Sequence, residues 1–444
     1  MRIGLIAMSG IRACDPELMK LGFSLPGFVE RGKTIASLPS LGLLTLAALT
    51  PTRIEVEYVE VRDLAISDAP LNRYDLVAIS SYTAQILEAY ALADRYRERG
   101  VPVVLGGLHV SVLPQEAAQH ADAVVVGEGE LSWPALLRDF ECGRLQPCYG
   151  SREAQFNLAD SPVPAYELLD TTRYNRLTVQ TSRGCPFRCD FCASSILLTS
   201  KYKQKPVANV IAEIREITNL WRRPFIEFAD DNGLVNRHYS RELLEPVGSL
   251  GVRWFTETDL SIADDPELLA LMHDSGCAEV LIGFESPEAP ALAGIELKSN
   301  WKWRKFDAYE RGIRTIQDHG IRVNGCFILG LDGHDESIFD TVYDFVRRTE
   351  LFDVQITVLT PFPGTPLYQR LEREGRLLEP AAWQRCTLFD VNFRPHNMTA
   401  EALAHGLRDL GVRLYNGEFT AWRRRRFQDR VKSAVFLGRS TCPR

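Results

Sequence analysis

The chain has 444 residues, 45% of them hydrophobic and 25% charged, and a formal net charge of −7 at pH 7. This length allows two or three domains with large cores, and the negative charge argues against a general nucleic-acid binder. No apolar run approaches a membrane span, and the N-terminal stretch lacks the pattern of a signal peptide. The ten cysteines, three of them clustered, fit a reducing compartment, so we expect a cytoplasmic protein.

The first 140 residues alternate short apolar runs with helical patterns. Such repetition predicts a doubly wound parallel sheet of the Rossmann-like kind, covered by helices on both faces. The expected strands and helices are 2–7, 41–49, 54–59, 76–80, 84–99, 101–105 and 123–126.

Polar and glycine residues follow several of these strands. In open α/β sheets, ligands bind at the carboxyl ends of the strands, and paired glycines let the backbone approach a flat ligand closely. The plainer alternative is that these are turn glycines of the kind that any doubly wound domain needs. The candidate residues are Ser80, Ser81, Tyr82, Gly106, Gly107, His109, Gly127 and Glu128.

A polar, proline-containing stretch then leads into a second domain. From residue 177, strand candidates recur with room for a helix after each, which predicts a partial (β/α)6 barrel with its chemistry at the carboxyl ends of the strands. The run Arg423 to Arg426 is interpreted as a solvated helix face rather than an anion contact. The expected strands are 177–181, 225–229, 253–257, 279–284, 322–329 and 354–359, followed by a helix at 400–419. The expected divisions are 1–145, a linker at 146–175, a barrel at 176–370 and a mostly helical region at 371–444.

Three cysteines stand just after the first barrel strand. Cys185, Cys189 and Cys192 have the spacing C-x3-C-x2-C. Three thiolates this close can each bind one iron of a 4Fe-4S cube, which leaves the fourth iron open to a substrate. A structural zinc site would need four ligands, and no fourth cysteine or histidine follows nearby.

The segment Arg183-Gly-Cys-Pro-Phe-Arg-Cys-Asp-Phe-Cys resembles the cluster loop of radical S-adenosylmethionine (radical SAM) enzymes. The resemblance implies that the three cysteines bind the irons. It also implies that S-adenosylmethionine (SAM) binds the open iron and is cleaved by one-electron reduction to a 5′-deoxyadenosyl radical. An external reductant of the flavodoxin or ferredoxin kind would supply the electron.

The N-terminal half resembles the cobalamin-binding domain that precedes many radical SAM domains. The eight candidate residues at its strand ends match the recurrent turns of that domain, which implies that they bind cobalamin. The Asp-x-His-x-x-Gly signature of several cobalamin enzymes is absent, so no lower cobalt ligand is identified. His109 lies in a glycine turn, where hydrogen bonding to a loop or to the corrin is favoured over cobalt ligation.

Three further strand ends resemble the SAM-binding positions of the same family. Asp230 and Asp231 would lie over the methionine ammonium, with helix capping as the alternative. Glu285 and Ser286 would bind the ribose hydroxyls. Gly325 would let adenine pass along the backbone, unless it serves only packing.

The resemblance implies a cobalamin-dependent radical SAM enzyme that methylates an unactivated centre of a small molecule or natural product. A radical cyclase or rearrangement enzyme is the main alternative. A cobalamin or redox sensor without turnover is a second, but no output module such as a helix-turn-helix is visible. The substrate is left open.

Overall fold

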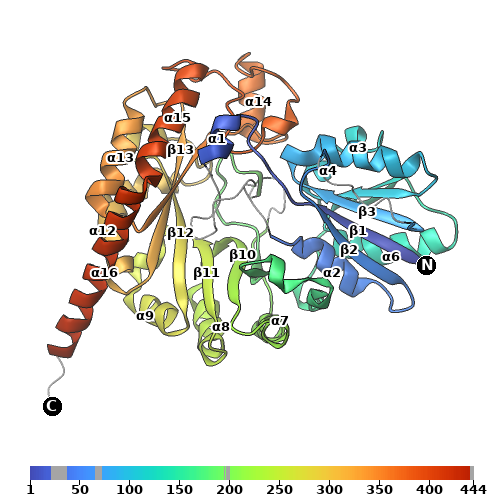
Figure 1. The fold of residues 1–444 in the computed structure, drawn as a ribbon, viewed down its shortest axis with the longest axis horizontal. Helices are drawn as coiled ribbons and strands as arrows, with labels where there is room; N and C mark the ends of the chain where they lie inside the picture. The colour runs from blue at the N-terminus through green and yellow to red at the C-terminus, as the bar shows by residue number, and fades with distance from the viewer. Residues whose placement is uncertain (22–37, 66–72, 195, 197–200, 441–444) are drawn as a thin grey trace.

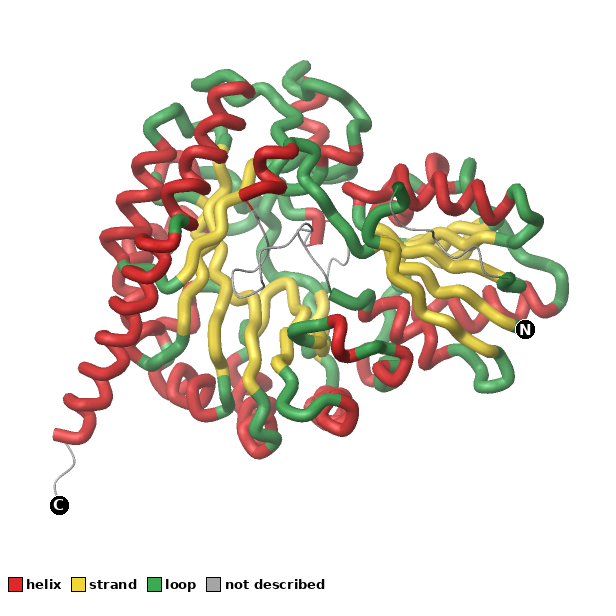
Figure 2. Tube along the Cα trace, in the orientation of Figure 1, coloured by secondary structure: helices red, strands yellow, loops and turns green. Residues whose placement is uncertain are grey.

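The computed structural model describes residues 1–21, 38–65, 73–194, 196 and 201–440. Two parallel six-stranded sheets lie side by side, each flanked by helices (Figures 1 and 2). Among the described helices, none is both long and apolar enough to cross a membrane.

The first sheet has the strand order β2-β1-β3-β4-β5-β6, with every pair parallel. Alternate residues of each strand enter two separate cores. Leu5 and Ala78 pack with α2 and α6, whereas Ile6 and Val77 pack with α3 on the other face. The predicted doubly wound sheet is therefore confirmed. Its strands are β1 (Arg2–Met8), β2 (Glu55–Val61), β3 (Leu76–Ser81), β4 (Val103–Gly106), β5 (Ala123–Gly127) and β6 (Cys148–Ser151). Its helices are α1 (Pro16–Leu21), α2 (Leu41–Leu49), α3 (Ile86–Arg97), α4 (Leu108–Val112), α5 (Pro114–Ala117) and α6 (Gly129–Glu141).

The second sheet has the order β14-β13-β12-β11-β10-β7, again fully parallel, and forms the predicted partial barrel. A short hairpin, β8 (Ser182–Arg183) with β9 (Lys203–Gln204), flanks the cysteine loop. The strands are β7 (Leu177–Val179), β10 (Phe225–Gly233), β11 (Arg253–Thr258), β12 (Cys277–Glu285), β13 (Arg322–Leu329) and β14 (Asp353–Val358). The helices are α7 (Val207–Leu220), α8 (Arg237–Ser249), α9 (Pro266–Asp274), α10 (Ala289–Leu292), α11 (Trp301–Lys305), α12 (Tyr309–Asp318), α13 (Ile338–Thr349) and α14 (Pro366–Arg373).

The expected helix at 400–419 is two helices, α15 (Ala400–Tyr415) and α16 (Gly417–Ser440). Asn416 has extended backbone angles, and its side-chain oxygen accepts a hydrogen bond from the Phe419 amide at 2.8 Å. Asparagine is a favoured N-cap, so this residue ends one helix and begins the next.

The arginine run in α16 is not simply a solvated face. Arg423 is fully buried, donates to the carbonyls of Phe352 and Leu414, and lies 3.3 Å from Asp353. Arg426 pairs with Glu350. Residues three apart share a helix face, so this side of α16 packs against the end of the barrel that carries the amino ends of its strands.

A buried ion pair lies between the hairpin and α7. Lys205 Nζ is 2.5 Å from Glu213 Oε1, and the two side chains are 3% and 1% exposed. Lys205→Met should lower the free energy of unfolding by about 3–5 kcal/mol, because it leaves a buried carboxylate without its cation. Urea denaturation measures this loss. Lys20→Met removes an exposed pair with Glu17 and should change nothing measurable; equal effects of the two variants would contradict the prediction.

Candidate functional site

A cavity of about 530 Å³ opens at the carboxyl ends of the barrel strands. Cys185, Cys189 and Cys192 all line it. The remaining wall contains acidic and apolar side chains, together with polar ones such as Lys302, Gln355 and Thr357. Carboxylates come from β10, β11 and β12, namely Glu227, Asp231, Glu257 and Glu285. Apolar side chains come from β13, β14 and the segments after them, namely Ile328, Val358, Leu359, Phe362 and Leu388.

Two adjacent carboxylates hold the start of the cysteine loop. Asp230 is buried and accepts hydrogen bonds from the amides of Thr181 and Ser182, both at 2.8 Å. Asp231 points the other way along β10, lines the cavity and accepts from the Gly184 amide at 2.8 Å. Successive strand residues face opposite sides, so only the second carboxylate can meet a ligand.

The donor set fits an iron–sulfur cluster. Burial raises the pKa of the Cys185 thiol to about 11, so a bound cation is needed to hold it as thiolate. In the described part of the chain, no three Cys, His, Asp or Glu side chains converge as ligands of one metal ion. A 4Fe-4S cube instead takes one cysteine per iron, which suits three thiols spread along a cavity wall.

Asn232, next to these carboxylates, was not singled out by its sequence. Its amide nitrogen lies 3.8 Å from Cys185 Sγ and 3.1 Å from Asp259. Its oxygen is buried and has no hydrogen-bond partner within the described residues. An unpaired buried acceptor beside the thiols suits a ligand that donates a hydrogen bond.

Glu285 ends β12 with a positive φ of 64°, which is uncommon for a residue other than glycine. Its carboxylate lies 2.6 Å from Lys302 Nζ, and both residues line the cavity. Lys302 also donates to the Gly283 carbonyl at 2.8 Å. It comes from α11, outside the strands, so strand-end reasoning gave no signal for it.

Ser286 and Gly325 lie away from the cavity lining. Ser286 is fully buried, and its hydroxyl bonds His334 Nε2 at 2.9 Å and the Glu288 amide at 3.0 Å. A Cβ on Gly325 would lie 2.8 Å from a Leu351 methyl, so this glycine serves packing between strand and core. Neither residue faces the space that a ligand would fill.

Glu257 is a carboxylate of the wall for which the described residues supply no side-chain partner. The residue is accessible to solvent, but it faces a cavity that is surrounded by protein. Burial, followed by the carboxylates of Glu227, Asp231 and Glu285, raises its pKa to about 8. Glu227, by contrast, pairs with Arg176. Glu257 ends the predicted strand 253–257, a position that sequence reasoning does point to, whereas Glu227 lies in mid-strand, where only its alternation with outward residues could have identified it.

Glu257→Gln should make stability less dependent on pH. The unfolded carboxyl loses its proton near pH 4.5, whereas the folded one keeps it until about pH 8. Between these two pH values the folded protein binds more protons than the unfolded one. The free energy of unfolding of the wild type therefore falls as the pH rises. The variant should therefore gain stability over wild type at pH 8.5 but not at pH 4, by less than the full shift implies because solvent enters the cavity. Thermal unfolding of wild type and variant at both pH values tests this. A difference in stability between the two proteins that is the same at pH 4 and pH 8.5 would contradict it.

The first sheet presents its carboxyl edge to the barrel. Its strand order places the topological switch point between β1 and β3, where ligands of such sheets bind. Ser9, directly after β1, has a buried hydroxyl without a partner among the described residues. Ser80 and Ser81 end β3, and a Cβ on Gly107 would come 3.2 Å from Ser80 Oγ. The edge fits a flat cofactor, and Ser9 was missed because it is a single hydroxyl without a motif.

Tyr82 stands in the space between the domains. It is 53% exposed, yet burial raises its pKa, with Glu227 of the barrel and Glu60 as further causes. A ring that is accessible to solvent and still surrounded by protein faces an internal opening rather than the outer surface.

His109 has no exposed side-chain surface. Its ring contacts Glu116 at 3.3 Å and Thr83 at 3.4 Å and meets Trp383 edge-on at 5.4 Å. These contacts join the first domain to the C-terminal region and leave no nitrogen for a cofactor. Burial lowers the pKa of His109, which favours the neutral ring.

The three remaining candidates from the predicted glycine turns, Gly106, Gly127 and Glu128, have different surroundings. A Cβ on Gly106 would have room, with Val125 at 3.7 Å. Gly127 has φ +83°, and a Cβ there would lie 2.4 Å from the Ser151 carbonyl, so β6 requires this glycine. Glu128 is buried and bonds the cysteine-loop hairpin rather than an open edge.

Family models match three consecutive parts of the chain. The radical SAM superfamily matches residues 179–346, the B12 binding domain matches 33–137, and a domain of unknown function (DUF4070) matches 365–437. Among characterised relatives, bacteriochlorophyllide d C-12(1)-methyltransferase of Chlorobaculum tepidum is 28% identical over 383 residues, covering 85% of this chain and 82% of the relative. Hopanoid C-2 methylase of Rhodopseudomonas palustris is 29% identical over 359 residues, covering 77% and 66%.

Solved structures share the whole architecture. The radical SAM methyltransferase TsrM from Kitasatospora setae, with cobalamin and a 4Fe-4S cluster bound, superposes with a TM-score of 0.68 at 16% identity, covering 94% of this chain and 89% of that chain. The cobalamin-dependent SAM radical enzyme OxsB superposes with a TM-score of 0.60 at 15% identity, covering 86% and 62%. At such identities the likeness concerns the fold alone.

Fold, cysteine loop and family matches define a radical SAM enzyme with a B12-binding domain. The cofactors of these two domains are a 4Fe-4S cluster and SAM for the radical SAM domain and cobalamin for the B12-binding domain, and the relatives that the chain resembles are named as methyltransferases.

Proposed function

We propose that this enzyme methylates an unactivated carbon of a mainly apolar small molecule bound in the barrel cavity. The observation that carries the proposal is the composition of the wall: cysteines and carboxylates from the cysteine loop and β10 to β12, and apolar side chains, interspersed with Gln355, Thr357 and Thr360, from β13, β14 and the segments after them. Relatives named for methylating a bacteriochlorophyllide and a hopanoid support this class of substrate.

We assign the iron ligands to Cys185, Cys189 and Cys192. When bound, the cluster with SAM supplies the radical that removes a substrate hydrogen, and cobalamin supplies the methyl group. Asp231 and Glu285 are the acidic residues positioned to hold polar groups of SAM, since both line the cavity near the cysteine loop. Asp230 holds the loop from behind.

The apolar wall orients the substrate and excludes water. Ile328, Val358, Leu359 and Leu388 offer hydrocarbon surface, and Phe362 also packs against the core of the first domain. Burying an apolar substrate here contributes about 25 cal/mol per Å² of surface removed from water. A dry wall also keeps a reactive centre from side reactions with solvent.

At the first sheet we assign the cobalamin edge to Ser9, Ser80, Ser81, Tyr82 and Gly107. We propose that this domain extends through β6, because that strand pairs with β5. We further propose an external one-electron reductant and a cytoplasmic, reducing location, which suits nine described cysteines that form no disulfides.

Anaerobic reconstitution with iron, sulfide and hydroxocobalamin tests the function. The reduced enzyme is incubated with methyl-deuterated SAM and a small-molecule extract, and products are analysed by mass. We expect 5′-deoxyadenosine, S-adenosylhomocysteine and a product carrying the deuterated methyl group. Deoxyadenosine with an unlabelled, rearranged product would favour a cyclase, and no deoxyadenosine at all would contradict the proposal.

A further inference from the structure

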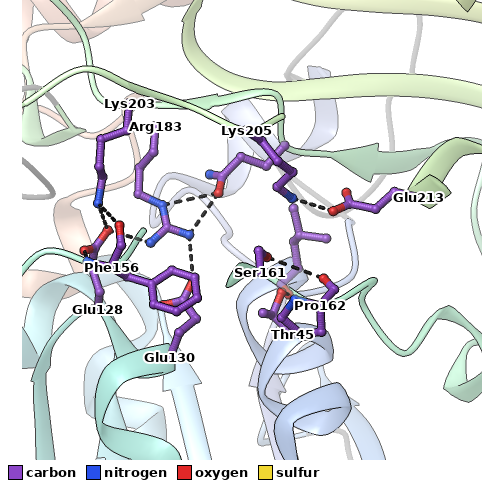
Figure 3. A network of polar contacts seen from close by, with 12 residues as sticks. Thr45, Glu128, Glu130, Phe156, Ser161, Pro162, Arg183, Lys203, Lys205 and Glu213 are labelled. Atoms are coloured by element: carbon purple, nitrogen blue, oxygen red, sulfur yellow. Dashed lines mark hydrogen bonds and ion pairs between the residues drawn. The ribbon is translucent and has the colours of Figure 1, made fainter. Parts of the chain in front are cut away.

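Four charged side chains join the first domain to the cysteine loop (Figure 3). Glu128 lies between β5 and α6, Glu130 in the first turn of α6, Arg183 on β8 and Lys203 on β9. Arg183 donates from Nη1 to Glu128 at 2.7 Å and from Nη2 to Glu130 at 2.6 Å. Lys203 Nζ lies 2.5 Å from Glu128 Oε1.

This cluster is shielded and balanced in charge. Its four side chains are only 7–16% exposed, and two cations face two carboxylates. Burial alone would raise the pKa of Glu128, but the hydrogen bonds from Lys203, the Phe156 amide and Arg183 lower it overall. The guanidinium donates from two different nitrogens to two carboxylates at once, a geometry that lysine cannot reproduce.

Arg183 lies two residues before Cys185, so its ion pairs with Glu128 and Glu130 hold the cluster loop itself. The next residue, Gly184, is held from the barrel side by Asp231. The loop is thus anchored from both domains. The turn that holds Arg183 follows β5 on the same sheet edge as the strand ends of β3 and β4, where Ser80 and Gly107 lie.

We propose that Arg183 is a positioning residue that fixes the cluster loop relative to the carboxyl edge of the first sheet, with Glu128 and Glu130 as its dock. This inference rests on the proposed function, since that edge is the assigned cobalamin site. Glu128, expected from its motif to contact cobalamin, acts through Arg183 instead. Methyl transfer needs the two cofactor sites at a fixed separation, and a misplacement of about 1 Å is costly to such reactions.

The test compares Arg183→Met and Arg183→Lys with Arg53→Met, which removes an exposed arginine–glutamate pair with Glu141 within the first domain. In the cofactor-free protein, amide hydrogen exchange of residues 181–185 and 128–130 should rise roughly tenfold in Arg183→Met, less in Arg183→Lys and not in Arg53→Met. If Arg183→Met fails to fold, Glu130→Gln takes its place. It removes only one of the two carboxylates that bind Arg183, so the rise in exchange rate should be smaller.

A second measurement reads the separation of the sites directly. Electron paramagnetic resonance of protein holding both cob(II)alamin and the reduced cluster should show their magnetic coupling in wild type and Arg53→Met, and weakened or heterogeneous coupling in Arg183→Met. Unchanged exchange and unchanged coupling in Arg183→Met would overturn the positioning role. A wild type that binds both groups but forms no deoxyadenosine would overturn the proposed function and leave the exchange result standing.

Discussion

Cys189→Ala should abolish both the iron–sulfur cluster and 5′-deoxyadenosine formation. Cys189 is buried in the wall of the cavity together with Cys185 and Cys192. Removing one of three ligands leaves an iron without its thiolate. Iron and sulfide content, the visible spectrum and nucleoside products measure the loss, which we expect to reach the assay background.

Cys326→Ala is the matched control, because Cys326 lines the same cavity from β13 but lies outside the loop. Its sulfur is 3.8 Å from the Gln355 amide nitrogen, a weak contact. We expect wild-type iron content and deoxyadenosine formation from this variant. A cluster that survives in Cys189→Ala, or fails in Cys326→Ala, would show that the ligands are assigned incorrectly.

Asp230→Ala should destabilise the protein and disorder the cysteine loop. The carboxylate receives the amides of Thr181 and Ser182 as well as the Thr181 hydroxyl in a buried position. Truncation leaves two buried backbone donors without acceptors, which costs roughly 2–5 kcal/mol. Urea denaturation of the cofactor-free protein measures the loss, and we also expect poor cluster retention.

The neighbouring variant Asp231→Ala separates loop support from ligand binding. Asp231 lines the cavity, where water can replace its bond to the Gly184 amide, so its loss should cost much less stability. Asp230→Asn keeps one acceptor and should fall between wild type and Asp230→Ala. If Asp231→Ala proved the more destabilising of the two alanine variants, the assignment of Asp230 as the support would be wrong.

Strand-end reasoning located the right regions but could not tell which side chains face the cavity. Asp230 and Asp231 were equivalent in sequence, yet the alternation of a strand sends one behind the cysteine loop and the other into the cavity. Ser286, one residue beyond the end of β12, forms a buried hydrogen bond with His334 instead, after the positive φ of Glu285 has turned the chain. The register of β12 and β10, which decides this, depends on pairing with their neighbours.

The amino-acid sequence by itself determined what is local: the two parallel-sheet architectures, whose strands follow from apolar runs, and the cysteine spacing, which a short loop fixes. Only the tertiary structure decided contacts between distant segments. Lys302 meets Glu285 from a separate helix, and Arg423 is buried against the barrel although its run of charges favoured solvent. Arg183 meets Glu128 across the two domains. Such pairs form when folding brings together segments that are far apart in the sequence. No periodicity in the sequence encodes which of their charged residues will meet.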